Sequence, residues 1–275
     1  MLKQLLKYEF KATRSYYGSA YLALLASALL LGAGASHMPR IGGADLDALW
    51  GVLALVYMGT ILAIIVLTVQ QIIERFSKNL LGREGYLMHT LPVTPAQLIL
   101  SKLLSSAVWG ICSLCVGVLS VAVLMLASQP SILLHLGDLL HIGIELPENF
   151  PEGVRYTLSL LAGIFLMFLA WAACQVLRVY TCCMIGHQAP RHMAPVGIVS
   201  FFVLSSAQGW LENLVVAGGA WLMVKLLGEQ ALSFPMPGEG PFWLYVAGFI
   251  LMQAVFGALY FLATDWMMKK RLNLE

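Results

Sequence analysis

The stretch that decides the fold is residues 48–73, ALWGVLALVYMGTILAIIVLTVQQII, which contains no Asp, Glu, Lys or Arg. A helix of this length is longer than the hydrocarbon core of a bilayer is thick, since about 20 residues are enough to cross it. A helix at the surface of a soluble protein keeps a polar face, and this stretch has none. Residues 48–73 are therefore predicted to form a membrane-spanning α-helix.

Five other apolar runs have the same character, and the composition of the chain agrees with them. Of the 275 residues, 60% are hydrophobic and 11% are charged, and the mean hydropathy is +0.82, outside the range of soluble domains. The sequence predicts an all-α integral membrane protein with six transmembrane helices, at residues 16–36, 48–73, 98–126, 156–177, 195–224 and 242–267.

A short basic segment precedes the first span. In residues 2–14 the apolar side chains recur at helical spacing on one side and the Lys and Arg side chains lie on another, a pattern typical of a helix that lies on the membrane surface. We expect an amphipathic helix at residues 1–15 and a six-span domain at 16–275. Within that domain we expect an outer loop at 127–155, cytoplasmic loops at 74–97 and 178–194, and both termini in the cytoplasm.

The orientation follows from the basic residues, because Lys and Arg near the ends of a span resist translocation. If the N-terminus is inside, Arg40, Arg155 and Lys225 lie outside, and the other thirteen of the 16 basic residues lie on the cytoplasmic side. These thirteen are Lys3, Lys7, Lys11, Arg14, Arg75, Lys78, Arg83, Lys102, Arg178, Arg191, Lys269, Lys270 and Arg271.

Familiar catalytic and nucleotide-binding motifs are missing from the sequence. No Gly precedes a Lys, so there is no GK[ST] phosphate-binding loop, and neither HExxH nor GxSxG occurs. The metal-capable set His135, Asp138, His141 and Glu145 reads better as the polar face of an interfacial helix. The set Cys182, Cys183, His187 and His192 lacks the usual zinc spacing. We expect no catalytic residue, no metal site and no cofactor in this chain.

Three polar residues interrupt the fifth span: Gln208, Glu212 and Asn213. A carboxylate inside a membrane is costly unless it faces a protein interior or a water-filled cavity. One interpretation is that the three line a conduit or mark a hinge in a broken helix. The other is that the span ends early and that they lie in an outer-leaflet loop.

The loop at residues 74–97, ERFSKNLLGREGYLMHTLPVTPAQ, is the longest polar stretch on the cytoplasmic side. Residues 75–81 can form two helical turns, which Gly82 would stop. The tetrapeptide Thr94-Pro95-Ala96-Gln97 has a hydroxyl at the N-cap position, Pro at the first helical position and Gln at the third. This pattern predicts a capping box that fixes the start of the third span.

The chain resembles the permease subunits of ABC-2-type transporters, the type V exporter architecture. The resemblance covers the whole chain and rests on three strings: KQLLKYEFKATR at 3–14, RFSKNLLGREGYLMHTLPVTPAQLILSK at 75–102 and ALYFLATDWMMKKRLNLE at 258–275. The second string is the most specific and is similar to small permeases of Firmicutes-type bacteria. The resemblance implies an N-terminal elbow helix before six spans, in the bacterial cytoplasmic membrane.

The resemblance also implies partners and docking residues. In that family the loop between spans two and three holds a coupling helix that docks into a separate ATPase. By position, the docking residues would be Arg75, Phe76, Lys78, Asn79, Leu81, Gly85, Tyr86, Thr90 and Pro92. A second contact would lie at 181–192, and short re-entrant helices at 214–227, with a break at Gly218-Gly219. The implied partners are two copies of the ATPase, which carry ATP and Mg, a second permease that is identical or paralogous, and the lipid bilayer, with no nucleic acid.

The expected function is therefore an exporter permease that moves an amphipathic cargo, such as an antimicrobial peptide, a drug or a lipid-like molecule, with energy from the partner ATPase. Two alternatives stay open. The first is an ion-coupled secondary transporter or channel with Glu212 on its path. The second is a membrane component that senses or sequesters peptide for immunity.

Overall fold

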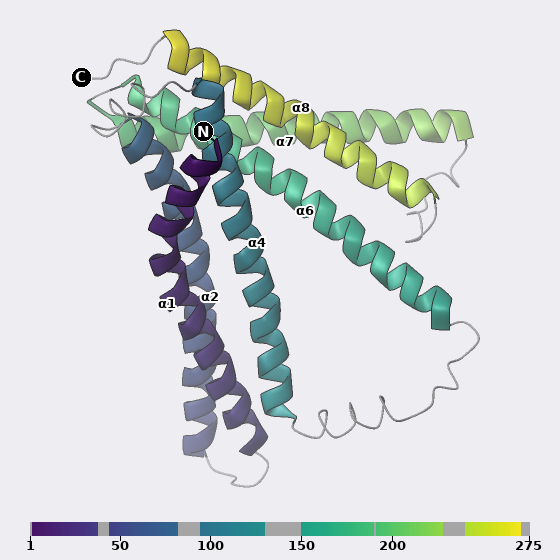
Figure 1. Ribbon diagram of the computed structural model, residues 1–275. Helices are drawn as coiled ribbons and strands as arrows, with labels where there is room; N and C mark the ends of the chain where they lie inside the picture. Colours follow the sequence, from purple (N-terminus) through teal and green to yellow (C-terminus); the bar gives the residue numbers. More distant parts are fainter. Residues whose placement is uncertain are drawn as a thin grey trace. The chain divides into compact units, whose positions relative to one another are not determined.

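The computed structural model of the protein describes residues 2–37, 44–81, 94–129, 150–189, 191–227 and 240–270, and the regular secondary structure in these ranges is helical (Figure 1). The α-helices are α1 Leu2–His37, α2 Ala44–Phe76, α4 Pro95–Ser128, α6 Phe150–His187, α7 Met193–Leu227 and α8 Gly240–Lys270. A π-helix, η2 Ser77–Leu81, follows α2 directly.

Six of these helices are long and apolar enough to cross a bilayer. The candidate spans are Tyr16–Ser36, Ala48–Phe76, Pro95–Ser128, Tyr156–His187, Met193–Gly219 and Phe242–Lys270. Large apolar side chains cover their outer faces; Leu244 and Leu251 of α8, for example, are 74% and 67% exposed. Such faces suit lipid, which solvates apolar side chains as well as a protein interior does. The predicted all-α multi-pass architecture is confirmed at this level.

The chain divides into two compact units, and each is described by itself. One unit comprises Met1–Gln71 and Leu104–Leu146, and the other comprises Ile72–Leu103 and Pro147–Glu275. The first therefore contains α1 with most of α2 and α4. The second contains the end of α2, η2, the start of α4, and α6, α7 and α8.

The first unit is held by apolar packing around α1. Leu24, Ala28 and Leu31 recur on one side of α1 and are buried with Tyr57 and Ile64 of α2. A Cβ added at Gly32 would lie 2.6 Å from the Cβ of Ala127 on α4. Only a residue without a side chain permits this close approach of α1 and α4, as is common between membrane helices.

Hydroxyl groups and aromatic rings supplement this packing within the first unit. The ring of Tyr17 stacks on Trp109 with centroids 4.5 Å apart. The Tyr21 hydroxyl lies 2.7 Å from the Ser113 hydroxyl, and the Tyr57 hydroxyl lies 3.0 Å from that of Ser120. Each contact joins α4 to another helix, so the three helices are linked by polar contacts as well as by apolar ones.

In the second unit, α6 packs against both α7 and α8 (Figure 1). Glycines again allow these helices to approach each other closely. A Cβ added at Gly163 would lie 2.7 Å from the Phe242 ring on α8, and one at Gly186 would lie 2.7 Å from the Met193 carbonyl oxygen on α7. Phe242 and Val246 are buried at this contact. The helix α6 is thus the central element to which the functional residues described below are attached.

Three sequence-based boundaries differ from the structure. Residues 2–37 form one continuous helix, so the elbow at residues 1–15 is not confirmed as a separate element. The segment predicted as loop 178–194 is helical in its first part, because α6 continues to His187. The predicted re-entrant break at Gly218-Gly219 is also wrong, since α7 runs unbroken to Leu227. In a bilayer every backbone group needs a partner, so continuing the helix costs less than breaking it at two glycines.

Candidate functional site

A cluster of polar side chains lies between α6, α7 and α8, and Gln208 of α7 is at its centre. The Gln208 Oε1 atom accepts a hydrogen bond of 2.9 Å from the Tyr260 hydroxyl and a longer one of 3.4 Å from Nη1 of Arg178. The Gln208 Nε2 atom donates to Oε1 of Glu212 at 2.7 Å and approaches Oε1 of Gln253 at 3.4 Å. One amide therefore contacts all three helices.

The helical period explains why these residues meet. Gln208 and Glu212 are four residues apart on α7, and Gln253 and Tyr260 are seven apart on α8, so each pair shares one side of its helix. On α6, Arg178 is four residues after Cys174, whose thiol lies 3.7 Å from Nε2 of Gln208. Three helices that are otherwise apolar therefore place their polar positions at the same level of the bundle.

Arg178 is the cation of the cluster and is buried. It donates to Gln208 and to Oε1 of Gln175, and its guanidinium carbon lies 4.9 Å from the centre of the Phe201 ring. An Arg over an aromatic face gains a cation–π attraction that is stronger away from water. Its Nε atom is buried with no hydrogen-bond partner in the described part of the chain.

Glu212 is the anion of the cluster and is half-buried. Both amide donors reach the same oxygen: Nε2 of Gln208 at 2.7 Å and Nε2 of Gln253 at 3.0 Å both contact Oε1. Because Gln208 accepts from Arg178 at one end and donates to Glu212 at the other, its amide dipole bridges the two charges. A buried charge is tolerated when hydrogen bonds surround it in this way.

A second set of contacts lies one turn further along α6. The Thr181 hydroxyl donates to the Leu177 carbonyl of its own helix at 3.0 Å and reaches the Tyr260 carbonyl on α8 at 3.2 Å. It also lies 3.0 Å from the Thr264 hydroxyl, and both threonines are buried. These contacts fix the register between α6 and α8 beside the Arg178 cluster.

The predicted coupling segment begins in the same unit. The ring of Phe76, the last residue of α2, stacks on Tyr180 of α6 with centroids 4.2 Å apart and planes inclined by 10°. Both rings are buried, at 0% and 1% exposure. Tyr180 lies between Arg178 and Thr181 in the sequence of α6, so the end of α2 is attached to the helix turn that carries the polar cluster.

The other predicted docking residues fall into three groups. The segment from Ser77 to Leu81 continues α2 as a π-helix, and Lys78 forms an ion pair of 2.9 Å with Glu74 of the preceding turn. Arg75 lies in the last turn of α2, while Asn79 and Leu81 are described as part of η2 by their backbone. Gly85, Tyr86, Thr90 and Pro92 lie outside the described residues.

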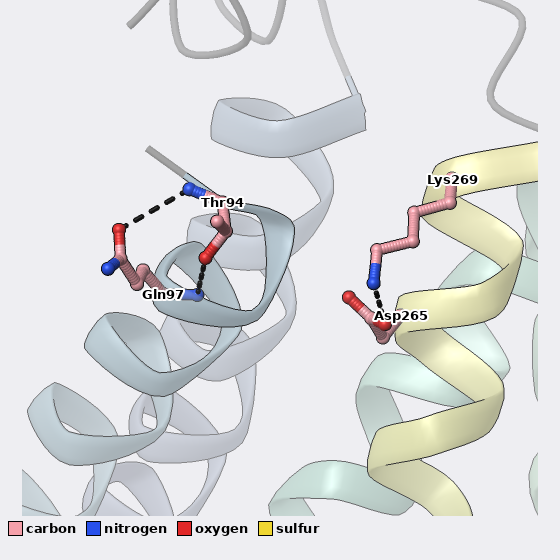
Figure 2. Close-up of polar contacts among 4 residues, drawn as sticks. All are labelled: Thr94, Gln97, Asp265 and Lys269. Atoms are coloured by element: carbon pink, nitrogen blue, oxygen red, sulfur yellow. Dashed lines mark hydrogen bonds and ion pairs between the residues drawn. The ribbon is translucent and has the colours of Figure 1, made fainter. Parts of the chain in front are cut away.

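The capping box that the sequence predicts at the start of the third span is confirmed (Figure 2). The amide N–H of Gln97 donates to Oγ1 of Thr94 at 3.4 Å, and the amide N–H of Thr94 donates to Oε1 of Gln97 at 3.3 Å. The helix α4 begins at Pro95, as expected. The same view shows Lys269 paired with Asp265 one turn earlier on α8, which gives that carboxylate of the sixth span a local partner.

The second predicted ATPase contact, residues 181–192, is mostly helix. Thr181, Cys182 and Met184 are buried within α6 packing, so they do not form a free cytoplasmic surface. Arg191 and His192, which lie between α6 and α7, are exposed. The exposed part of the predicted contact is therefore the turn after His187.

The structure separates the three candidate conduit residues. It brings Gln208 and Glu212 together, but Asn213 is exposed and bonds the Gly209 carbonyl of its own helix at 2.9 Å. Sequence reasoning missed Arg178, Gln253 and Tyr260. Arg178 was assigned to a loop, and the available signal for Gln253 was its position as an uncharged polar residue inside an apolar run.

Among the described residues no group of three His, Cys, Asp or Glu side chains could hold a metal ion. The set His135, Asp138, His141 and Glu145 lies outside the described residues.

The fold and the cluster define a class: a multi-pass α-helical membrane protein with a charged network inside one helix bundle. No family model, no curated protein sequence and no solved structure matches the chain.

Proposed function

We propose that the chain is the permease subunit of an ATP-binding cassette exporter in a bacterial cytoplasmic membrane, with both termini inside. It moves an amphipathic cargo, such as an antimicrobial peptide, a drug or a lipid-like molecule. The energy comes from ATP and Mg on a separate ATPase, present in two copies. A second permease, identical or paralogous, completes the transport path.

The observation that carries this proposal is the sequence of residues 75–102, which resembles the coupling loop of ABC-2 permeases, in a chain that has no phosphate-binding loop. A transporter without its own nucleotide site needs an external source of energy or an ion gradient. The local structure at both ends of the loop supports a role in transmitting force, because both ends are anchored to the helices. The loop leaves α2 through the buried Phe76–Tyr180 stack, and it enters α4 at a capped first turn.

These two anchors suggest how a push on the loop would act. A force on the segment after Phe76 reaches Tyr180, because two stacked buried rings in a close-packed interior do not move independently. Tyr180 shares its helix turn with Arg178, whose partners are on α7. ATP-driven closure of the ATPase subunits would in this way bias the arrangement of α6 and α7 between two states.

The test is coexpression with the ATPase, followed by assays of ATP hydrolysis and transport in proteoliposomes. Charge reversal at Arg75 and Lys78 is expected to leave hydrolysis in place and to lower transport per ATP. Charge reversal at Lys269 and Lys270, exposed residues at the end of α8 that belong to neither predicted contact, is the matched comparison and is expected to have the smaller effect. If the reversed loop variant assembles with the ATPase and transports as the wild type does, the docking role is wrong.

A second candidate function is an ion-coupled transporter or channel, and one specific observation favours it. Glu212 is a carboxylate inside a predicted span, a position typical of ion pathways. Ion-driven uptake in liposomes that lack any ATPase, abolished by Glu212→Gln, would favour this alternative. Binding of peptide with no ATP-dependent efflux would favour the sensing or immunity component instead.

A further inference from the structure

We propose that Glu212, held by Gln208 and Gln253, binds the positively charged group of the transported molecule, so that the cargo is a cationic amphiphile carrying an ammonium or guanidinium group. The proposal rests on the proposed function for calling the ligand a cargo. The binding site itself is argued from α6, α7 and α8 alone and is testable without an ATPase.

The first step is the direction of the carboxylate. The amide donors of Gln208 and Gln253 reach Oε1 at 2.7 and 3.0 Å, and this fixes the plane of the group. Two donors on one oxygen leave Oε2 to accept from a further donor, since each carboxylate oxygen has two lone pairs and both oxygens share the charge. An N–H of a cation is the donor that binds a carboxylate most strongly.

The second step is the charge around the site. Arg178 directs its bonds to Gln208 and Gln175 and lies over the Phe201 ring, so the side chain of Gln208 separates its charge from Glu212. A carboxylate at membrane depth without a cation in direct contact is costly, and that cost falls when a cation binds. The site should therefore bind a positively charged ligand more tightly than a neutral ligand of the same shape.

The third step is access. Glu212 is half-buried, while Gln208 beside it is buried, so part of the Glu212 side chain is accessible from outside the bundle. A Cβ added at Gly209, three residues earlier on α7, would meet nothing within 4 Å. Four residues later, Val216 is 60% exposed. On α7 the accessible part of Glu212 is thus flanked by Asn213, whose amide bonds the Gly209 carbonyl, and by the apolar Val216, which suits a cationic head with an apolar body.

The same chemistry argues against a bare metal ion. Ca²⁺ and Mg²⁺ need about six or more oxygen ligands, and two of the groups nearest to Glu212 present amide N–H donors instead. An ammonium group needs few acceptors and can keep water on its other side. The donor set therefore favours an organic cation over Ca²⁺ or Mg²⁺.

The experiment compares two probes with the same chain. Protonated n-dodecylamine and uncharged N-acetyldodecylamine are titrated by calorimetry into the full-length protein in lipid nanodiscs, with empty nanodiscs subtracted. A charge-assisted hydrogen bond predicts that the wild type binds the amine roughly tenfold or more tightly than the amide. Glu212→Gln keeps the shape and removes the charge, and it is expected to bring that ratio close to one.

Two further variants guard against misfolding. Glu212→Asp keeps the charge and is expected to retain part of the amine preference. Ser200→Ala alters a hydroxyl about three turns earlier on α7 that bonds the Val196 carbonyl of its own helix, and it is expected to keep the full ratio. An equal affinity of the wild type for both probes overturns the proposal, as does an unchanged preference in Glu212→Gln. A change in oligomeric state of Glu212→Gln with unchanged amine preference would assign the carboxylate to contact with a second copy and would also overturn it.

Failure of this inference and failure of the exporter proposal are distinguishable. The probe ratio is measured on the isolated chain, whereas the exporter proposal depends on ATP-dependent transport with the coexpressed ATPase. A wild type that transports with ATP but does not distinguish amine from amide refutes the cation site alone. A wild type that distinguishes them but never transports with ATP refutes the exporter role alone.

Discussion

The stack of Phe76 on Tyr180 is the contact through which the loop after α2 would act on the α6–α7–α8 bundle. Both rings are fully buried and lie nearly parallel at 4.2 Å. Replacing a buried Phe by Ala costs about 3–5 kcal/mol in a soluble core, of which the aromatic pairing contributes about 0.5–1.5 kcal/mol. The contact is therefore large enough to matter both for stability and for transmission of movement.

Two substitutions separate these contributions. Phe76→Ala removes the ring and leaves a cavity, so we expect the free energy of unfolding in detergent to fall by about 3–5 kcal/mol. Phe76→Leu keeps an apolar side chain and removes the stacking, so a loss of about 1–3 kcal/mol is expected. Phe165→Ala on α6, where the ring is 39% exposed, is the control and is expected to cost less.

The functional assay is transport per ATP hydrolysed, with the ATPase coexpressed and the complex in proteoliposomes. If the stack transmits movement, loss of its pairing energy lowers this ratio roughly two- to tenfold in Phe76→Leu, because about 1.4 kcal/mol corresponds to a factor of ten. Hydrolysis itself should persist. The reasoning is refuted if Phe76→Ala unfolds like the wild type, or if Phe76→Leu is destabilised but transports with an unchanged ratio.

Three further predictions test other parts of the structure. Thr94→Ala removes the hydroxyl of the capping box, and we expect it to lower the free energy of unfolding by about 0.5–2 kcal/mol, measured by thermal unfolding. Ser128→Ala, whose exposed hydroxyl bonds its own helix, is the control and is expected to change the free energy of unfolding little. Gln208→Leu leaves Arg178, Tyr260 and Glu212 without the amide that they share. The free energy of unfolding should therefore fall by more than the roughly 1–3 kcal/mol that one unsatisfied buried group costs. Asn213→Leu is the comparison and should lower the free energy of unfolding less. Lys78→Cys, in a background with the five native cysteines replaced, should react with an impermeant maleimide in inside-out vesicles and not in intact cells; labelling in intact cells would reverse the assigned orientation.

The sequence predicts the membrane architecture because that information is local. An apolar run such as 48–73 is long enough to cross a bilayer whatever its neighbours are, and the structure has a helix there. The capping box at Thr94 and Gln97 is local as well, since both partners lie within one turn. The six apolar helices and the capping box are therefore predicted correctly, whereas the break at Gly218-Gly219, which was also inferred from neighbouring residues, is not.

Arg178 was misplaced because its environment is not local. A charge next to an apolar run is assigned to water when its partners are unknown, and here the partners are on α7 and on α6 itself. Moving Arg178 out of the loop leaves twelve basic residues on the side that is predicted to be cytoplasmic, against three on the other, so the predicted orientation does not change. The cluster as a whole needs the packing of three helices, so Gln208 and Glu212 could be proposed from sequence, whereas Gln253 and Tyr260 could not.

The position of the cluster relative to the Phe76–Tyr180 stack has a mechanical consequence for the bundle. Arg178, Tyr180 and Thr181 are within four consecutive residues of α6, and their side chains contact α7, the end of α2 and α8 respectively. Because one helix turn cannot shift in parts, a displacement of the end of α2 must either break the stack or move all three contacts together. Gln208 accepts from Arg178 and donates to Glu212, so a movement of Arg178 would also change the hydrogen bonds that reach Glu212. We therefore expect a push on the end of α2 to alter the contacts of α6 with α7 and with α8 together.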